Sequence, residues 1–364
     1  MEPSTSGDPA GLPASASAVP APELPYADRS TGLIIFGILE IIGGAFAALA
    51  IPLMFLTAVL SNRSAGGGMP VRSVFLSVLT YAIAAVVLIF LGVGAVQAKR
   101  WARALNLIVA CMWLVGGAMV TLALVFVLPS ATMSGVRMAA AQNPQGPQAP
   151  TGMMAVIVTL MIAFMAFFFV VLPVVFLLFY RSRNVEQTCR HRDPVERWTD
   201  RLPLPVIAYA MLAGFGAAYY FFMAFVTPLF PFFGRYLTGI PGGIACFVFA
   251  AIDAYVAFSF LRLNVNGWWL ALVSIVIRIA AAATTYGRAD ILAAYARLGW
   301  SDAQLEAMQH NPMFRNGAFL WISLAVIVPY LGLLLWTKRY FRTPPAITYV
   351  GIDSPLSNPI QPGS

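Results

Sequence analysis

The chain has 364 residues, of which 60% are hydrophobic and only 10% are charged. Soluble domains contain about 25% charged residues, so a chain this apolar cannot cover its core with polar surface. The composition excludes a soluble enzyme, a disordered chain and a disulfide scaffold, and it predicts an integral membrane protein. The net charge of +8 does not indicate a nucleic-acid partner, because the basic residues lie mostly at the ends of apolar runs.

The first residues, 1–31, are predicted to be a disordered cytoplasmic tail. They are rich in Pro, Ala and Ser, they carry acidic residues, and they contain no continuous apolar run before Gly32. This pattern differs from that of a cleaved signal peptide. Residues 343–364 are again rich in proline and are predicted to be a second disordered tail.

Between the tails lie eight apolar runs, each long enough to cross a bilayer as a helix, which takes about 20 residues. The runs are too long and too uniformly apolar for the strands of a barrel. The predicted fold class is therefore all-α, a polytopic transmembrane helical bundle with eight spans. The runs cover residues 32–60, 73–97, 102–129, 152–180, 203–227, 241–262, 267–286 and 317–337.

The two halves of this membrane region, residues 32–181 and 203–342, have similar patterns. Each half begins with a helix rich in small residues, has a short link that contains Trp, and has a long loop before its last helix. An even number of helices in each half gives both the same orientation in the membrane. The sequence therefore predicts two parallel four-helix repeats, joined by a linker at 182–202.

Lys and Arg residues are about twice as frequent on one side of the predicted spans as on the other. The richer side holds the linker 182–202 and both ends of the chain. Because basic loops stay in the cytoplasm, we expect both termini to be cytoplasmic.

The linker is rich in arginine. Asp193, Pro194 and Glu196 together resemble a helix start and predict a short helix near 194–200. Cys189, His191 and Asp193 alternate without a second cluster, so a metal site is not expected there. We expect these linker residues to contact lipid headgroups or a partner: Arg190, Arg192, Arg197, Trp198 and Arg201.

Two segments on the opposite side have a recognisable pattern. Residues 287–316 predict two amphipathic helices, near 291–298 and 301–310, separated by Gly299. They either cap the bundle or form a partner-binding or gating element. Residues 218–236 are rich in aromatic side chains. They form either an interfacial aromatic belt or a pocket for a flat apolar ligand such as a quinone or a lipid.

Three charged residues lie inside the predicted spans: Glu40, Asp253 and Arg278. Such charges usually face the interior of a bundle. Asp253 and Arg278 lie at similar depths on consecutive helices, about 14–17 Å from the cytoplasmic end, so we expect an ion pair, and Glu40 is placed to join it. The pair either fixes helix packing or forms a proton-coupling or anion-binding site.

Catalytic motifs are missing from the sequence. It has no His-Glu-x-x-His helix, no Gly-x-Ser-x-Gly turn and no Walker phosphate loop. Its two histidines, His191 and His310, both lie in predicted loops. We therefore expect no catalytic residue, no cofactor and no metal, and an enzyme is possible only through carboxylate or arginine chemistry.

Two cytoplasmic motifs carry a resemblance: Lys-Arg-Trp-Ala-Arg at 99–103, and Cys-x-x-Arg-Asp-Pro-x-x-Arg-Trp-Thr-Asp at 189–200. With them the membrane region resembles uncharacterised multi-pass membrane proteins of bacteria that have no assigned reaction. The resemblance implies the bacterial cytoplasmic (inner) membrane.

The function that we expect is a non-enzymatic membrane component that contacts lipids and binds a membrane-protein partner or a second copy of itself. The alternative is a small-molecule or lipid transporter that uses Asp253 and Arg278. A membrane enzyme is the third hypothesis.

Overall fold

The computed structural model describes residues 26–64, 71–142, 151–286, 288–310 and 318–342, and both predicted tails lie outside them apart from residues 26–31. The helices of the first half are α1(Ser30–Ser64), α2(Val71–Val96), α3(Arg100–Gln142), α4(Thr151–Ala166) and α5(Leu172–Arg181). The linker forms α6(Arg183–Arg192) and α7(Trp198–Arg201). The second half has α8(Leu204–Val226), β1(Leu229–Phe232), β2(Arg235–Thr238), α9(Gly239–Leu261), α10(Val265–Thr285), α11(Ile291–Arg297), α12(Asp302–His310) and α13(Ala318–Arg342).

These helices contain seven segments that are long and apolar enough to cross a membrane, one of which runs through both α4 and α5. They confirm a multi-pass membrane protein that is almost entirely helical. The segments are Ser30–Thr57, Ser77–Val96, Arg100–Val125, Gly152–Arg181, Leu204–Val226, Gly239–Leu261 and Val265–Thr285. The eighth predicted span corresponds to α13, a helix of 25 residues that is not among the seven.

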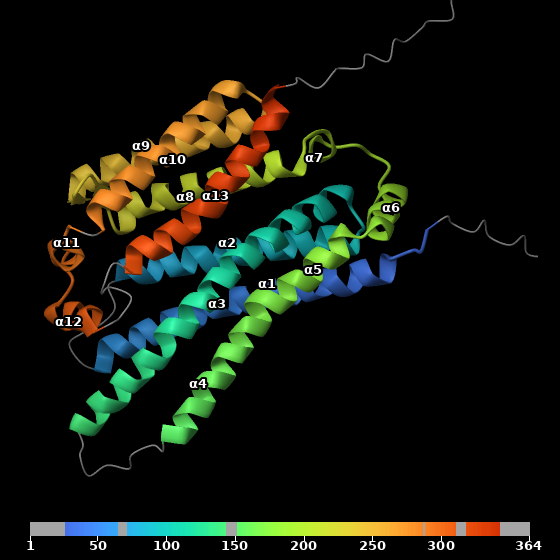
Figure 1. The fold of residues 1–364 in the computed structure, drawn as a ribbon. Helices are drawn as coiled ribbons and strands as arrows, with labels where there is room; N and C mark the ends of the chain where they lie inside the picture. The colour runs from blue at the N-terminus through green and yellow to red at the C-terminus, as the bar shows by residue number, and fades with distance from the viewer. Residues whose placement is uncertain (1–25, 65–70, 143–150, 287, 311–317, 343–364) are drawn as a thin grey trace, which may run out of the picture.

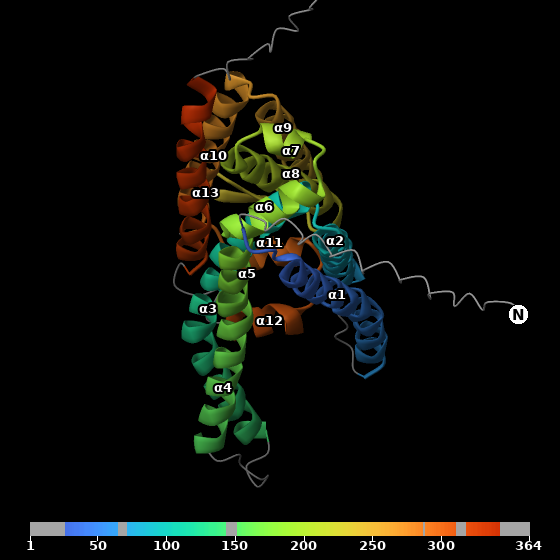
Figure 2. The same cartoon turned by 90° about the vertical axis from the view of Figure 1, so that its right-hand side faces the viewer.

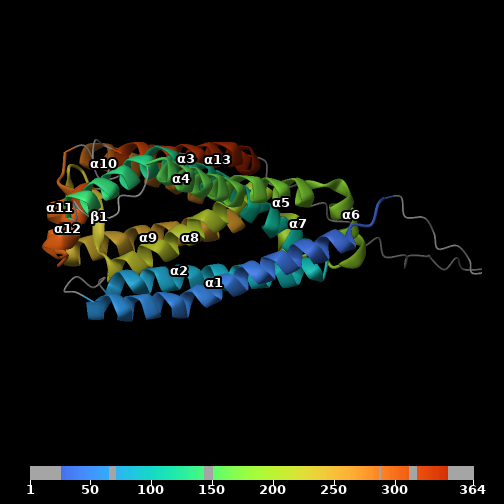
Figure 3. The same ribbon diagram turned by 90° about the horizontal axis from the view of Figure 1, so that it is seen from below.

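The axes of the long helices are roughly aligned, with helices running in both directions, so the bundle has two ends (Figures 1 and 3). One end holds α6, α7 and the first turns of α1, and the other holds α11 and α12. From the side, α3 and α4 run away together from the pair α1 and α2 (Figure 2). We refer to these ends as the α6–α7 end and the α11–α12 end.

Helices α1 and α2 pack closely because glycines meet at their contact. A Cβ on Gly37 would lie 2.7 Å from the carbonyl oxygen of Gly92, and a Cβ on Gly92 would lie 2.6 Å from that of Gly37. Close backbone approach between small residues is the usual way in which membrane helices associate. Helices α8 and α9 form the corresponding close pair of the second half.

Proline explains the irregular turn between α4 and α5. Pro173 has no N–H, and its ring clashes with the carbonyl four residues earlier, at Phe169. The chain responds with a π-helical turn at Phe167–Val171, in which the Leu172 N–H donates to the Phe167 oxygen. Gly117 on α3 lies directly against the Phe169 carbonyl and has no side chain to block it.

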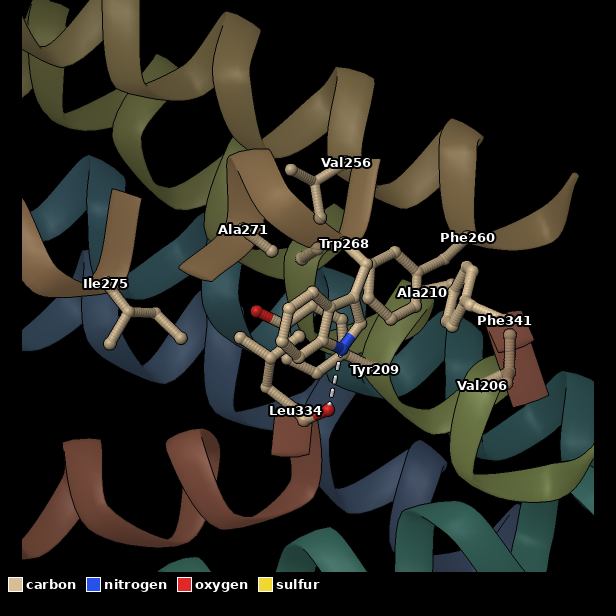
Figure 4. Close-up of a cluster of buried hydrophobic side chains, with 11 residues drawn as sticks. Val206, Tyr209, Ala210, Val256, Phe260, Trp268, Ala271, Ile275, Leu334 and Phe341 are labelled. Carbon is tan, nitrogen blue, oxygen red and sulfur yellow. Dashed lines mark hydrogen bonds between the residues drawn. The ribbon is translucent and has the colours of Figure 1, made fainter. Parts of the chain in front are cut away.

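The largest buried cluster lies in the second half and joins α8, α9, α10 and α13 (Figure 4). Trp268 is 2% exposed, and its Nε1 donates a hydrogen bond of 3.0 Å to the Leu334 carbonyl. A buried Trp requires such a partner for its N–H. This bond ties α10 to α13.

Candidate functional sites

Asp253 and Arg278 form a buried ion pair inside the second half of the bundle. The Arg278 Nη2 lies 2.6 Å from the Asp253 Oδ1, and the side chains are 18% and 5% exposed for Arg278 and Asp253. The pair forms because α9 and α10 are antiparallel neighbours joined by a tight turn at Leu263. The predicted pairing of these two residues is thus confirmed.

Aromatic rings cover the arginine of this pair. The Arg278 guanidinium carbon lies 4.9 Å from the ring centre of Tyr220 and 4.9 Å from that of Phe249. Two cation–π contacts of this kind stabilise a cation that has left water. Tyr220 lies in the aromatic segment 218–236, but the sequence did not connect it or Phe249 with the ion pair, because aromatic side chains are too common in these spans to stand out.

Three buried polar atoms around the pair have no hydrogen-bond partner within the described residues: Asp253 Oδ2, Arg278 Nε and Ser274 Oγ. A Cβ on Gly216 would lie 2.9 Å from the Asp253 Oδ2, so that oxygen is accommodated by the absence of a side chain. Ser274 lies one turn before Arg278 on α10, on the same face. Unpaired buried polar atoms are uncommon, and they concentrate at this pair.

Glu40 does not join Asp253 and Arg278, which corrects the prediction of a three-residue site. Its Oε1 accepts from the Tyr180 hydroxyl at 2.9 Å, and its Oε2 accepts from the Asn106 Nδ2 at 3.1 Å. All three side chains are at most 5% exposed. The prediction failed because depth along a helix does not specify which neighbours the helix faces.

The Glu40 cluster joins three helices of the first half. Glu40 lies on α1, Asn106 on α3 and Tyr180 on α5. The Arg103 Nε also donates to the Tyr180 carbonyl at 3.1 Å, and the Nη2 of the same arginine donates to Glu186 of the linker, so Arg103 connects the cluster to the linker. Asn106 is a polar residue within the predicted span 102–129, so its position in the sequence could have indicated a buried polar contact.

The linker folds onto the end of the first half through ion pairs. Arg103 lies 3.0 Å from Glu186, and Arg100 lies 3.3 Å from Asp200. The Arg29 N–H donates to the Thr188 hydroxyl at 3.1 Å. These contacts attach the linker helices to α1 and α3, so the linker is a folded cover of this end.

The prediction that a helix near 194–200 starts at Asp193 was wrong about the start. Asp193 instead ends α6, which the sequence did not predict, and the chain is not helical from there to Arg197. The Asp193 Oδ2 accepts from the Arg100 N–H at 3.3 Å, so this carboxylate caps α3. The short α7 begins at Trp198, and the Asp200 Oδ2 accepts from the Arg197 N–H at 3.0 Å.

The five linker residues predicted to face lipids or a partner differ in their partners. Arg190 pairs with Glu186 at 2.7 Å, and Arg192 pairs with Asp28 at 3.4 Å. The Ser30 N–H, and then Arg192, hold the pKa of Asp28 below its usual value. All five side chains are exposed, and neither Arg197 nor Arg201 has a carboxylate partner among the ion pairs of the described residues.

Cys189 lies on α6, on the face that packs against the first half of the bundle, and is 1% exposed. Burial raises the pKa of its thiol to about 11. His191, by contrast, is exposed, so the two do not face a common site. Over the residues that the structure describes, no three His, Cys, Asp or Glu side chains are grouped to hold a metal ion.

At the α11–α12 end, the aromatic segment 218–236 begins within α8, which ends at Val226, and its second part belongs to a β-hairpin of β1 and β2 that the sequence did not predict. Its strands pair Leu229 with Thr238 and Phe232 with Arg235. Phe233 and Gly234 both have positive φ at the turn. The two predicted amphipathic helices are present as α11 and α12, and Asp290 caps α11 by accepting from the Leu292 N–H at 2.8 Å.

Comparisons with protein-family models, curated protein sequences and solved structures found no significant match. The class that the fold defines is therefore a multi-pass helical membrane protein, and the function has to be argued from the chain itself.

Proposed function

We propose that this chain is a non-enzymatic membrane component that binds a protein partner. The observation that carries the proposal is the closed Asp253–Arg278 pair, with its two atoms 2.6 Å apart. A transport site needs these charges to be open to water and to a substrate. Here each charge neutralises the other, two rings cover the guanidinium, and Gly216 packs against the second carboxylate oxygen. The pair then serves helix packing.

The proposed architecture has eight spans in two parallel repeats, with α13 as the eighth span. It is supported by the links α2–α3 and α9–α10, which have the same turn. Ala98 and Leu263 both have left-handed φ, of 52° and 53°. The Lys99 N–H donates to the Gly94 carbonyl at 2.9 Å, as the Asn264 N–H donates to the Ser259 carbonyl at 2.9 Å. This is a Schellman motif in each half.

The proposed partner surface is the α11–α12 end. Both helices lie outside the seven apolar segments, and α12 makes its main contacts with α11. The side chains of Asp302 and Gln309 on α12 are exposed. A folded helix pair with polar side chains turned to solvent is suited to recognition of a second protein or a second copy of this chain.

The test is native mass spectrometry of the full chain, extracted gently from its own membrane. We expect a stoichiometric second protein or a second copy, which is lost from the variant Asp302→Arg/Gln309→Arg. The matched control is Arg190→Gln at the opposite end, which retains the partner. A monomer without any protein partner overturns the proposal.

A second candidate, a small-molecule or lipid transporter, is favoured by the unpaired atoms Arg278 Nε and Ser274 Oγ. A bound substrate would satisfy both of them. The same spectra decide between the two functions. A retained metabolite or lipid that is lost on Asp253→Ala, without a protein partner, supports transport.

A further inference from the structure

The ion pairs of the α6–α7 end divide its arginines into two groups. The first group is neutralised by carboxylates within the chain: Arg100, Arg103, Arg190 and Arg192. The second group is exposed and has no carboxylate partner among the ion pairs of the described residues: Arg29, Arg181, Arg183, Arg197 and Arg201. Arg197 and Arg201 differ from the other three because they flank the exposed Trp198 on α7. Their charge is available to something outside the chain.

The neighbours of these two arginines are apolar and exposed. Val195 is 61% exposed and Trp198 is 53% exposed. In membrane proteins Trp is enriched at the membrane–water interface, where its ring meets the headgroup layer. Arginine side chains at the same depth bury their stems and reach the lipid phosphates with their guanidinium groups.

The position of the segment along the chain sets its depth. α7 ends at Arg201, and α8, which begins at Leu204, is one of the apolar segments able to cross the membrane. Three residues in extended form cover about 10 Å. Arg201 and Trp198 therefore lie within reach of the headgroups around the start of α8.

We propose that Val195, Arg197, Trp198 and Arg201, here termed the linker patch, bind the headgroups of anionic phospholipids in the leaflet around the start of α8. The apolar side chains enter the interface, and the two guanidinium groups pair with phosphates. Two acids lie within the same segment. Asp200 pairs with Arg100, and the exposed Glu196 weakens the attraction. This site is independent of the proposed partner surface, which lies at the other end of the bundle.

The experiment is a lipid titration of the purified full chain, followed by native mass spectrometry. The two lipids are phosphatidylglycerol and phosphatidylcholine with identical acyl chains, and the preference for phosphatidylglycerol is measured. We expect Arg197→Gln/Arg201→Gln to lower that preference by roughly fivefold for each arginine removed. The matched control, Arg190→Gln/Arg192→Gln, removes the same charge from paired arginines and keeps most of the preference.

Two further variants separate binding from folding. Glu196→Gln removes the acid and is expected to raise the preference for phosphatidylglycerol, which a damaged fold would not do. Trp198→Phe is expected to reduce the fluorescence quenching by brominated phosphatidylglycerol more than any other Trp→Phe change at this end. Equal losses in the test and control pairs, or no effect of Glu196→Gln, overturn the proposal. If the native protein has no protein partner but keeps its preference for phosphatidylglycerol, the proposed function is overturned and the lipid site is not.

Discussion

At the scale of single residues, the Asp253–Arg278 pair shows what a buried charge requires. Within the apolar interior each ion is unfavourable without the other, because neither can be hydrated. The rings of Tyr220 and Phe249 at 4.9 Å supply a further contact for the arginine alone. Removal of one partner alone is therefore expected to lower the free energy of unfolding more than removal of both.

We predict that Asp253→Ala lowers the free energy of unfolding by about 3–5 kcal/mol, since it leaves Arg278 buried without a counter-charge. The double variant Asp253→Leu/Arg278→Met is expected to recover most of that loss. Stability is measured by unfolding in mixed micelles of mild and denaturing detergent. Equal stability of the single and double variants would contradict a structural ion pair.

Cys189 gives a pH-dependent prediction, because burial raises its thiol pKa to about 11. Below about pH 11 most of the Cys189 thiol is therefore protonated, and the protonated form does not react with alkylating reagents. In the background Cys111→Ser/Cys246→Ser, labelling by iodoacetamide at pH 8 is expected to be about 100-fold slower than for a free cysteine. The rate then rises about tenfold for each pH unit.

The control is the same protein unfolded in detergent, in which Cys189 labels at the ordinary rate. The pH profile is recorded by mass spectrometry of the labelled chain. A profile of the native protein that levels off near pH 9 would show that the linker does not bury this thiol.

At the scale of elements, packing depends on where side chains are absent. Gly117 and Gly116 are adjacent on α3, yet only Gly117 lies against the backbone of the π-helical turn Phe167–Val171, at the Phe169 carbonyl. A Cβ on Gly116 would meet no atom within 4 Å. The sequence contains both glycines, but it does not say which one faces the π-helical turn.

We predict that Gly117→Ala destabilises the protein by about 1–3 kcal/mol, because the added methyl group forces α3 away from the π-helical turn. Gly116→Ala serves as the matched control and is expected to leave stability unchanged or slightly raised, since Ala favours helix. Detergent unfolding of the two variants is compared with the wild type. A loss in Gly116→Ala as large as in Gly117→Ala would refute the packing argument.

The elements also show where local sequence signals mislead. Asp193 and Pro194 have the chemistry of a helix start, but the Asp193 carboxylate caps α3 instead, by accepting from the Arg100 N–H. Asp193 does cap a helix, as its residue type predicts, but that helix begins 93 residues earlier in the chain, at Arg100. Short capping motifs identify a capping group, and tertiary packing selects the helix.

At the scale of the whole molecule, the α6–α7 end holds the start of α1 and the end of α13 (Figure 3). Both ends of the described chain therefore lie at one end of the bundle. If α13 crosses the membrane, the number of crossings is even.

We predict that reporter domains fused to the N-terminus and to the C-terminus have the same sidedness. The expected side is the cytoplasm, because the basic residues concentrate at this end. Paired fusions to a fluorescent protein and to a periplasmic phosphatase measure it. Opposite sidedness of the two fusions would mean that α13 does not cross.

The sequence by itself determined the class of the protein, most of its helices and the Asp253–Arg278 pair. Hydrophobicity over about 20 residues is a local property of the sequence. Two opposite charges at similar depth on consecutive antiparallel helices pair with each other, because lipid offers neither of them another partner. Tertiary structure decided that Glu40 pairs with Tyr180 and Asn106, that a hairpin follows α8, and which linker arginines remain unpaired. Those outcomes depend on the rotation of each helix about its axis and on contacts between distant segments, which no local pattern of residues specifies.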